Sequence, residues 1–111
     1  MQIEESKQGA VTVLRPRGIL GAEEAPVLRA RALETFHKTL GRFVIDASDI
    51  PFVDSTGLET LYDIATQMSN SGLALKLCGE TETLREIFDL TDLSSAFEHY
   101  EEVGVAVRSF L

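Results

Sequence analysis

The sequence has few of the residues that most enzymes and metal sites depend on. Its single cysteine, Cys78, excludes an internal disulfide and offers no metal-ligand spacing, so we expect it to be a small buried hydrophobe. The two histidines, His37 and His99, have no evident partner nearby, and we expect both to be surface or packing residues. The sequence also lacks a G-x-S-x-G elbow, a phosphate-binding P-loop and a G-x-G-x-x-G motif. These absences favour a binding protein without a cofactor or resident metal over an enzyme.

Long apolar runs and positive charge are also scarce. No run approaches the length that spans a membrane, and no basic segment with an apolar stretch opens the chain, so we expect no membrane insertion and a cytoplasmic location. The net charge of −8 argues against nucleic-acid binding, which requires a basic face. Residues 43–111 hold thirteen of the 18 acidic residues and only three of the ten Lys and Arg. A partner of this portion is expected to be basic, although solubility alone explains the acidity equally well.

The length fits one domain, residues 1–111, large enough to bury roughly 65% of its unfolded surface. Hydrophobic periodicity and turn residues predict strands at 2–7, 10–17, 43–46, 73–77 and 97–100, and helices at about 23–40, 56–70, 81–90 and 103–110. The order ββαβαβαβα predicts an α/β fold, a mixed sheet of four or five strands with helices packed on it. Pro16 cannot donate to a strand ladder, so the end of its strand is expected at a sheet edge or a bulge.

The two long helices are each expected to bury one apolar face. In the first helix these residues are Leu28, Ala32, Leu33, Phe36 and Leu40. In the second they are Leu58, Leu61, Tyr62, Ala65 and Met68.

The stretch from Ile50 to Glu59 links a buried strand to the second long helix. Thr56 and Glu59 have the spacing of a capping box, which predicts Thr56 as the N-cap and places Ser55 just outside the helix with its hydroxyl in water. Asp54 flanks that hydroxyl, and Gly57 keeps the first turn free of bulk. A hydroxyl at a helix N-terminus suits phosphate, because free N–H groups and the macrodipole favour negative charge there. The same residues also fit a plain turn whose Asp, Ser and Thr only cap the helix.

Three carboxylates near this stretch present a second possibility. Asp46, Asp49 and Asp54 carry the oxygen ligands that a hard cation prefers. Loop carboxylates are usually just solvated, and we expect that here rather than a metal site.

The chain resembles the STAS domain of bacterial anti-sigma factor antagonists. The signature is F-V-I-D at residues 43–46 followed by V-D-S-T-G-L at residues 53–58. Gly18 matches an early glycine of the family, and T-D-L at residues 91–93 resembles a late T-G-L. The similarity covers nearly the whole chain, and its length and predicted element order agree with the family.

The resemblance implies a phosphorylation switch. Ser55, with Thr56 as second choice, would be phosphorylated by an ATP-dependent serine kinase that is also the anti-sigma factor. The unphosphorylated domain would bind this kinase and release its sigma factor, and a phosphoserine phosphatase would reset the switch. The partner-binding face would consist of Asp54, Ser55, Thr56, Gly57, Leu58 and Glu59. Neither catalysis nor a cofactor is implied, and the oligomeric state stays open.

Three positions depart from the family pattern. Gly21 replaces a common aspartate, which puts the loop near Ser55 in question. Glu59 stands where a small residue is usual, and this bears on how closely a partner docks along the helix. Asp92 replaces the glycine of T-G-L, where a left-handed backbone is expected; Asp tolerates that conformation better than most residues.

Two alternatives remain at this level. One is a STAS domain without a switch, a constitutive adaptor in a transport or stress-signalling assembly. The other is a response-regulator receiver, which D-x-x-x-I-P-x-x-D at residues 46–54 faintly resembles; Asp46 would then be phosphorylated with the help of Mg²⁺. The receiver's acidic pair after a first strand and its late Lys-Pro are both missing.

Overall fold

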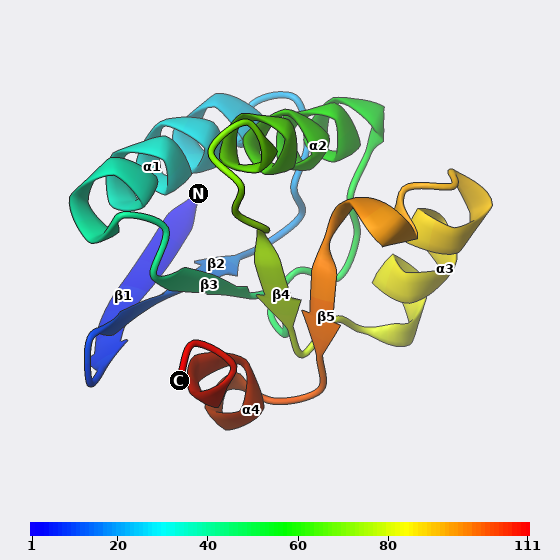
Figure 1. Ribbon diagram of the computed structural model, residues 1–111. Helices are drawn as coiled ribbons and strands as arrows, with labels where there is room; N and C mark the ends of the chain where they lie inside the picture. The colour runs from blue at the N-terminus through cyan, green and yellow to red at the C-terminus, as the bar shows by residue number, and fades with distance from the viewer.

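The computed structural model describes all of residues 1–111 and forms a five-stranded mixed sheet with helices on both faces (Figure 1). The elements are β1 (Gln2–Gln8), β2 (Val11–Arg17), α1 (Ala25–Thr39), β3 (Phe43–Asp46), α2 (Ser55–Ser69), β4 (Lys76–Cys78), α3 (Glu82–Leu90), the 3₁₀ turn η1 (Ser94–Ala96), β5 (Glu98–Tyr100) and α4 (Val103–Arg108). The predicted α/β class and the order ββαβαβαβα are confirmed, and η1 is an addition. None of the helices combines the length and the apolar character needed to cross a bilayer.

The strands lie in the spatial order β1-β2-β3-β4-β5. β1 runs antiparallel to β2, whereas the next three pairings are parallel. The end of β2 was expected at a sheet edge or a bulge; β2 is the second strand, and Pro16 pairs with Ile3 of β1 but has no partner in β3, so this end of β2 is an edge on one side only. Pro16 follows Leu14, the last residue of β2 that pairs with β3. A residue without an N–H is tolerated at such a place, where one side of the ladder has ended.

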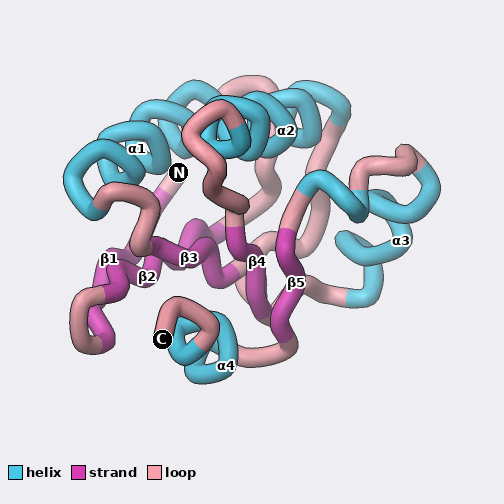
Figure 2. The backbone as a smooth tube through the Cα atoms, in the orientation of Figure 1, coloured by secondary structure: helices cyan, strands magenta, loops and turns pink.

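Successive side chains of each strand lie on opposite faces of the sheet, and this divides the interior into two parts. Leu14 and Ile45 belong to the larger core, which α1, α2 and α3 share with one face of the sheet. Val13 and Val44 belong to the smaller core beneath α4, on the opposite face. Figure 2 shows the same division, with α1 and α2 over one face and α4 under the other. The short parallel strands are therefore covered on both sides, as their continuous apolar character predicts.

Two residues of the predicted apolar faces are in fact exposed. Leu40 is 80% exposed because it adopts a left-handed conformation (φ 54°) at the end of α1, where it is the C-cap and no longer continues the helical face. Tyr62 is 48% exposed, and Ile64 is fully buried on the face of α2 instead. Three to four residues per two turns are enough to cover the sheet, so the side chain at the border of the apolar face remains in water.

The left-handed cap at Leu40 generates a stability prediction. A non-glycine residue in this conformation costs about 1–2 kcal/mol, whereas glycine loses up to about 1 kcal/mol through its more flexible unfolded state. Leu40→Gly should therefore raise the free energy of unfolding by up to about 1 kcal/mol in urea denaturation. Leu90, an exposed leucine in the last position of α3, is the matched control. Leu90→Gly should lower the free energy by about 0.5–1 kcal/mol, and equal losses in both variants would contradict the strain at Leu40.

Candidate functional site

The N-terminus of α2 is capped by Asp54 and not by Thr56. The Asp54 backbone is extended, and its Oδ1 accepts a 2.9 Å hydrogen bond from the Gly57 N–H. The predicted capping box of Thr56 and Glu59 is therefore wrong, and the helix begins at Ser55, its first residue. Asp54 and Thr56 are both good N-cap residues. Backbone contacts with Leu20, which is distant in sequence, fix the turn so that Asp54 rather than Thr56 occupies the N-cap position.

A two-stranded contact holds this turn in place. Leu20 and Val53 form an isolated parallel bridge, in which Leu20 N–H donates to the Phe52 carbonyl (3.0 Å) and Asp54 N–H donates to the Leu20 carbonyl (3.2 Å). Gly57 packs directly on this bridge. A Cβ at Gly57 would lie 2.3 Å from the Leu20 carbonyl oxygen and 2.6 Å from Cγ2 of Val53, so only glycine fits. The expectation that Gly57 keeps the first turn free of bulk is confirmed.

The candidate residues differ in their access to solvent. Ser55, Thr56 and Glu59 are exposed on the first turns of α2, and Asp54 is half-buried. Gly57 and Leu58 are buried. The two buried residues can only shape the turn from beneath, whereas Ser55, Thr56 and Glu59 are accessible to another molecule.

The electrostatics of this helix end are mixed. The N–H groups of Ser55 and Thr56 have no acceptor within the chain, and they lie at the positive end of a 15-residue helix. Asp54 and Glu59 add negative charge on either side of Ser55. The position therefore offers an exposed hydroxyl and two free donors, which suit a phosphoryl group, within an acidic surrounding.

Two departures from the family pattern have a clear structural setting. Gly21 is buried against Asp54, and a Cβ there would lie 3.2 Å from both Oδ2 of Asp54 and Oε1 of Glu24. A carboxylate at position 21 would thus meet two others, and its absence leaves Asp54 free to cap α2. Asp92 adopts the left-handed conformation (φ 61°) that was expected where the family has glycine.

The three aspartates considered for a cation serve other purposes. Arg15 donates a 2.9 Å hydrogen bond to Asp49 and lies 3.9 Å from Asp46. This hydrogen bond with Asp49 raises the pKa of Arg15. Asp46 also accepts a hydrogen bond from the Ser48 N–H, while Asp54 caps α2. No group of three or more His, Cys, Asp or Glu side chains is arranged to hold a metal ion.

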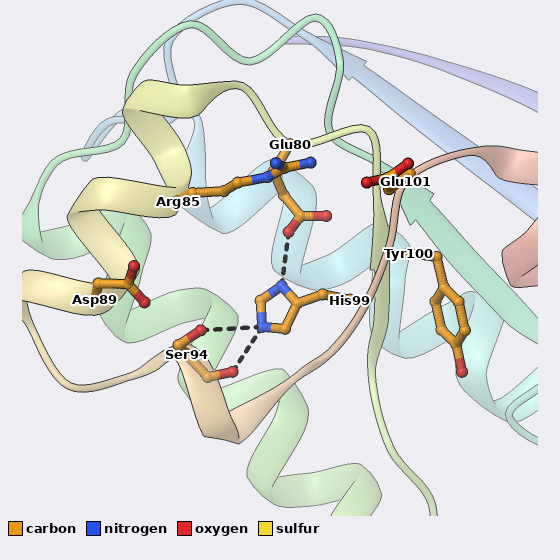
Figure 3. A pocket seen from close by; sticks show the side chains of 7 residues that line it. All are labelled: Glu80, Arg85, Asp89, Ser94, His99, Tyr100 and Glu101. Atoms are coloured by element: carbon orange, nitrogen blue, oxygen red, sulfur yellow. Dashed lines mark hydrogen bonds and ion pairs between the residues drawn. The ribbon is translucent and has the colours of Figure 1, made fainter.

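Residues far from α2 include one pair that the sequence did not indicate. His99 was expected to have no partner, but its Nδ1 lies 2.6 Å from Oε2 of Glu80 (Figure 3). The two residues are brought together by the parallel pairing of β4 with β5, in which Leu77 is opposite His99. No local pattern signals this contact between residues 19 apart. Cys78, by contrast, is fully buried as expected, and burial raises the pKa of its thiol to about 12.

Comparison with known proteins identifies the family. The sequence profile of the STAS domain matches residues 2–106, so the chain belongs to the STAS domain family. No curated protein sequence matches it. The fold is thus that of a STAS domain, and the receiver hypothesis is wrong: Asp46, its phosphoacceptor, is buried beside Arg15.

Solved structures share the fold at low sequence identity. A candidate anti-sigma factor antagonist from Thermotoga maritima has a TM-score of 0.86 at 21% identity, covering 96% of this chain and 92% of that chain. The unphosphorylated anti-sigma factor antagonist SpoIIAA, known from Bacillus, has a TM-score of 0.72 at 14% identity, covering 98% and 96%. A sulfate transporter family protein from Wolinella succinogenes has a TM-score of 0.79 at 18% identity, covering 94% and 87%. The same fold thus occurs in proteins described as antagonists and as transporters.

The contact beneath Gly57 generates the second prediction. Gly57→Ala forces a methyl group against backbone and should lower the free energy of unfolding by about 1–3 kcal/mol in urea denaturation. Gly104→Ala in α4 is the matched control, because its Cβ would meet only the flexible end of Arg108, at 3.2 Å. That variant should be neutral or stabilised by up to about 1 kcal/mol. If both variants behave alike, the Leu20–Val53 bridge does not constrain the helix start.

Proposed function

We propose that this STAS domain is a phosphorylation-controlled binding module of the anti-sigma factor antagonist type. In its unphosphorylated form it binds an anti-sigma factor that is also a serine kinase, and the sigma factor is released. Phosphorylation of Ser55 blocks this binding, and a phosphoserine phosphatase restores it. The observation that carries the proposal is the exposed hydroxyl of Ser55 at the first position of α2, in the D-S-T-G-L context of the family.

The proposed docking face is centred on the start of α2. Ser55, Thr56 and Glu59 provide its polar, accessible part. Ile19 (55% exposed) and Phe52 (47% exposed) add apolar surface from the two segments joined by the Leu20–Val53 bridge. Exposed apolar side chains next to acidic ones suit a partner that presents an apolar patch with basic residues. Asp54, Gly57 and Leu58 belong to the face mainly as its support.

The effect of a phosphate on this face is exclusion of the partner rather than refolding of the domain. Phosphorylation adds about −1.5 to −2 charges. The helix dipole stabilises that charge by about 0.3–1 kcal/mol, while Glu59, one turn away from Ser55, opposes it by about 0.2–0.5 kcal/mol. The stabilisation by the helix dipole and the repulsion by Glu59 nearly cancel. Burying an unpaired charge in an interface costs several kcal/mol, and each 1.4 kcal/mol is tenfold in affinity, so binding weakens by roughly a hundredfold or more.

A second function, a constitutive STAS adaptor in a transport or stress-signalling assembly, is supported by one observation. The fold is shared with the sulfate transporter family protein from Wolinella succinogenes and, at a TM-score of 0.71, with a murine anion transporter. In that function the same face binds its partner independently of charge at Ser55. The two functions therefore differ in their response to a negative charge at that residue.

The position of phosphorylation is tested with the cognate kinase. Incubation with the kinase and ATP, followed by mass spectrometry, should place one phosphate on Ser55. Ser55→Ala should abolish the label, and Thr56→Ala, which alters the neighbouring exposed hydroxyl, should retain it. Label that persists in Ser55→Ala would move the site elsewhere, with Thr56 the next candidate.

The consequence for binding is tested with charge variants. Ser55→Ala should bind the anti-sigma factor with nearly unchanged affinity in isothermal titration calorimetry. Ser55→Asp should bind roughly tenfold to a hundredfold more weakly, because it adds a single unpaired charge to the face. Circular dichroism should show both variants equally folded. Unchanged affinity in Ser55→Asp would contradict the switch and favour the adaptor.

A further inference from the structure

A cavity of about 350 Å³ lies between α3 and β5 and shares no residue with the proposed docking face. This volume is within the range of small-ligand sites. Figure 3 shows the side chains that surround it, from α3, the 3₁₀ turn η1, the strand β5, the loop before α3 and the loop after β5. Those used below are Glu80, Arg85, Asp89, Ser94, His99 and Glu101.

His99 and Glu80 form a closely paired unit in this cavity. His99 Nε2 lies 2.6 Å from the backbone carbonyl oxygen of Ser94, which can only accept, so Nε2 carries a hydrogen. His99 Nδ1 lies 2.6 Å from Oε2 of Glu80, and one proton is shared between these atoms. Whether that proton resides on the ring or on the carboxyl group, Oε2 is committed to His99. The other oxygen of Glu80, Oε1, remains an acceptor in both cases.

Oε1 of Glu80 has no partner within the protein. The Glu80 side chain is only 2% exposed, and no donor of the chain reaches Oε1, which points away from the His99 ring in Figure 3. The flanking backbone holds Glu80 in place: Gly79 N–H donates to the Tyr100 carbonyl, and Thr81 caps α3. A buried acceptor without a donor is costly. Oε1 itself has almost no accessible surface, so a ligand reaches it only when side chains at the wall of the cavity shift. A ligand that then supplies an N–H to Oε1 gains an interaction that the chain itself leaves unmade.

The charges around the cavity favour a cation. The charge of a protonated His99 is matched by that of Glu80, and Asp89 and Glu101 are exposed carboxylates at the rim. Arg85 is the one other cation of the cavity and forms no ion pair. Negative charge is thus in excess, so an anion would be repelled. A planar group with several N–H donors can contact a buried oxygen and a rim carboxylate together, which a compact ammonium does less well.

We propose that this cavity binds a guanidinium group, either of a small molecule or of an arginine side chain in a peptide. One N–H donates to Oε1 of Glu80, and the charge of the group faces Asp89 and Glu101. The site is separate from the Ser55 switch and gives the domain a second point of recognition.

The test is a titration followed by ¹⁵N–¹H correlation spectra of the full chain. Agmatine is the small-molecule probe, the tripeptide Gly-Arg-Gly is the side-chain probe, and tetramethylammonium at equal ionic strength is the control without N–H donors. Saturable shifts should occur at Glu80, His99 and Glu101 with a guanidinium probe and not with tetramethylammonium. Tighter binding of agmatine indicates a small-molecule ligand, and tighter binding of the tripeptide indicates a protein partner.

Variants locate the interaction. Glu80→Gln should weaken binding of the better probe about tenfold, because a hydrogen bond to a charged group is replaced by one to a neutral group. Glu86→Gln removes the same charge from an exposed position of α3 that does not line the cavity, and its affinity should stay within about twofold. Asp89→Asn, at the exposed rim, should weaken binding about twofold to fivefold. This variant is the replacement test if Glu80→Gln does not fold.

Arg85→Gln is the last variant to be tested, because the guanidinium of Arg85 could occupy the proposed site in place of the probe. If Arg85 competes for Glu80, removing it should increase the affinity for agmatine, which supports the proposed chemistry. The proposal is wrong if neither the wild type nor Arg85→Gln shows saturable shifts. It is also wrong if tetramethylammonium produces the same shifts, or if Glu80→Gln and Glu86→Gln bind alike.

Discussion

The position of the Ser55 hydroxyl depends on the close contact between the backbone at Leu20 and the first turn of α2. Two hydrogen bonds join the segment around Leu20 to Phe52 and Asp54, and Gly57 lets the helix approach this bridge without a side chain in between. Asp54 then caps the helix through Gly57, which leaves Ser55 as the first helical residue with its side chain in water. These contacts brace the turn on which the hydroxyl stands, so the proposed kinase and docking partner would both meet a preformed surface.

Much of the fold could be predicted from local pattern, because each element carries a clear period and ends at a recognisable turn. The site was predictable less precisely. Asp54 and Thr56 have similar capping chemistry, and the choice between them follows from Leu20, more than thirty residues earlier. Exposure at Leu40 depends on a left-handed turn that leucine rarely adopts. The pairing of Glu80 with His99 depends on the register of two parallel strands, which residue spacing does not encode.

The proposed switch and the proposed guanidinium site follow one architectural rule. Ser55 is the first residue after the connection from β3, and Glu80 lies within the connection from β4; both connections leave the carboxyl ends of neighbouring parallel strands. In open α/β sheets this edge is where functional groups gather, because the loops there diverge and expose side chains held by the strands. Asp46 and Gly79 meet between the two connections, where a Cβ on Gly79 would lie 3.1 Å from Oδ1 of Asp46. Each loop is thus positioned partly by its neighbour.

One of the two outer strands of the sheet, β1, bears on how the protein behaves at high concentration. β1 leaves one side of its backbone unpaired, and an unpaired edge can recruit strands from other molecules. Its side chains are almost all exposed, and Glu4 and Glu5 are held by Arg17 and Arg31. Charged side chains of both signs thus line this edge, and they oppose its pairing with an apolar strand of another molecule. The charge on β1 thereby disfavours fibre-like stacking along this edge.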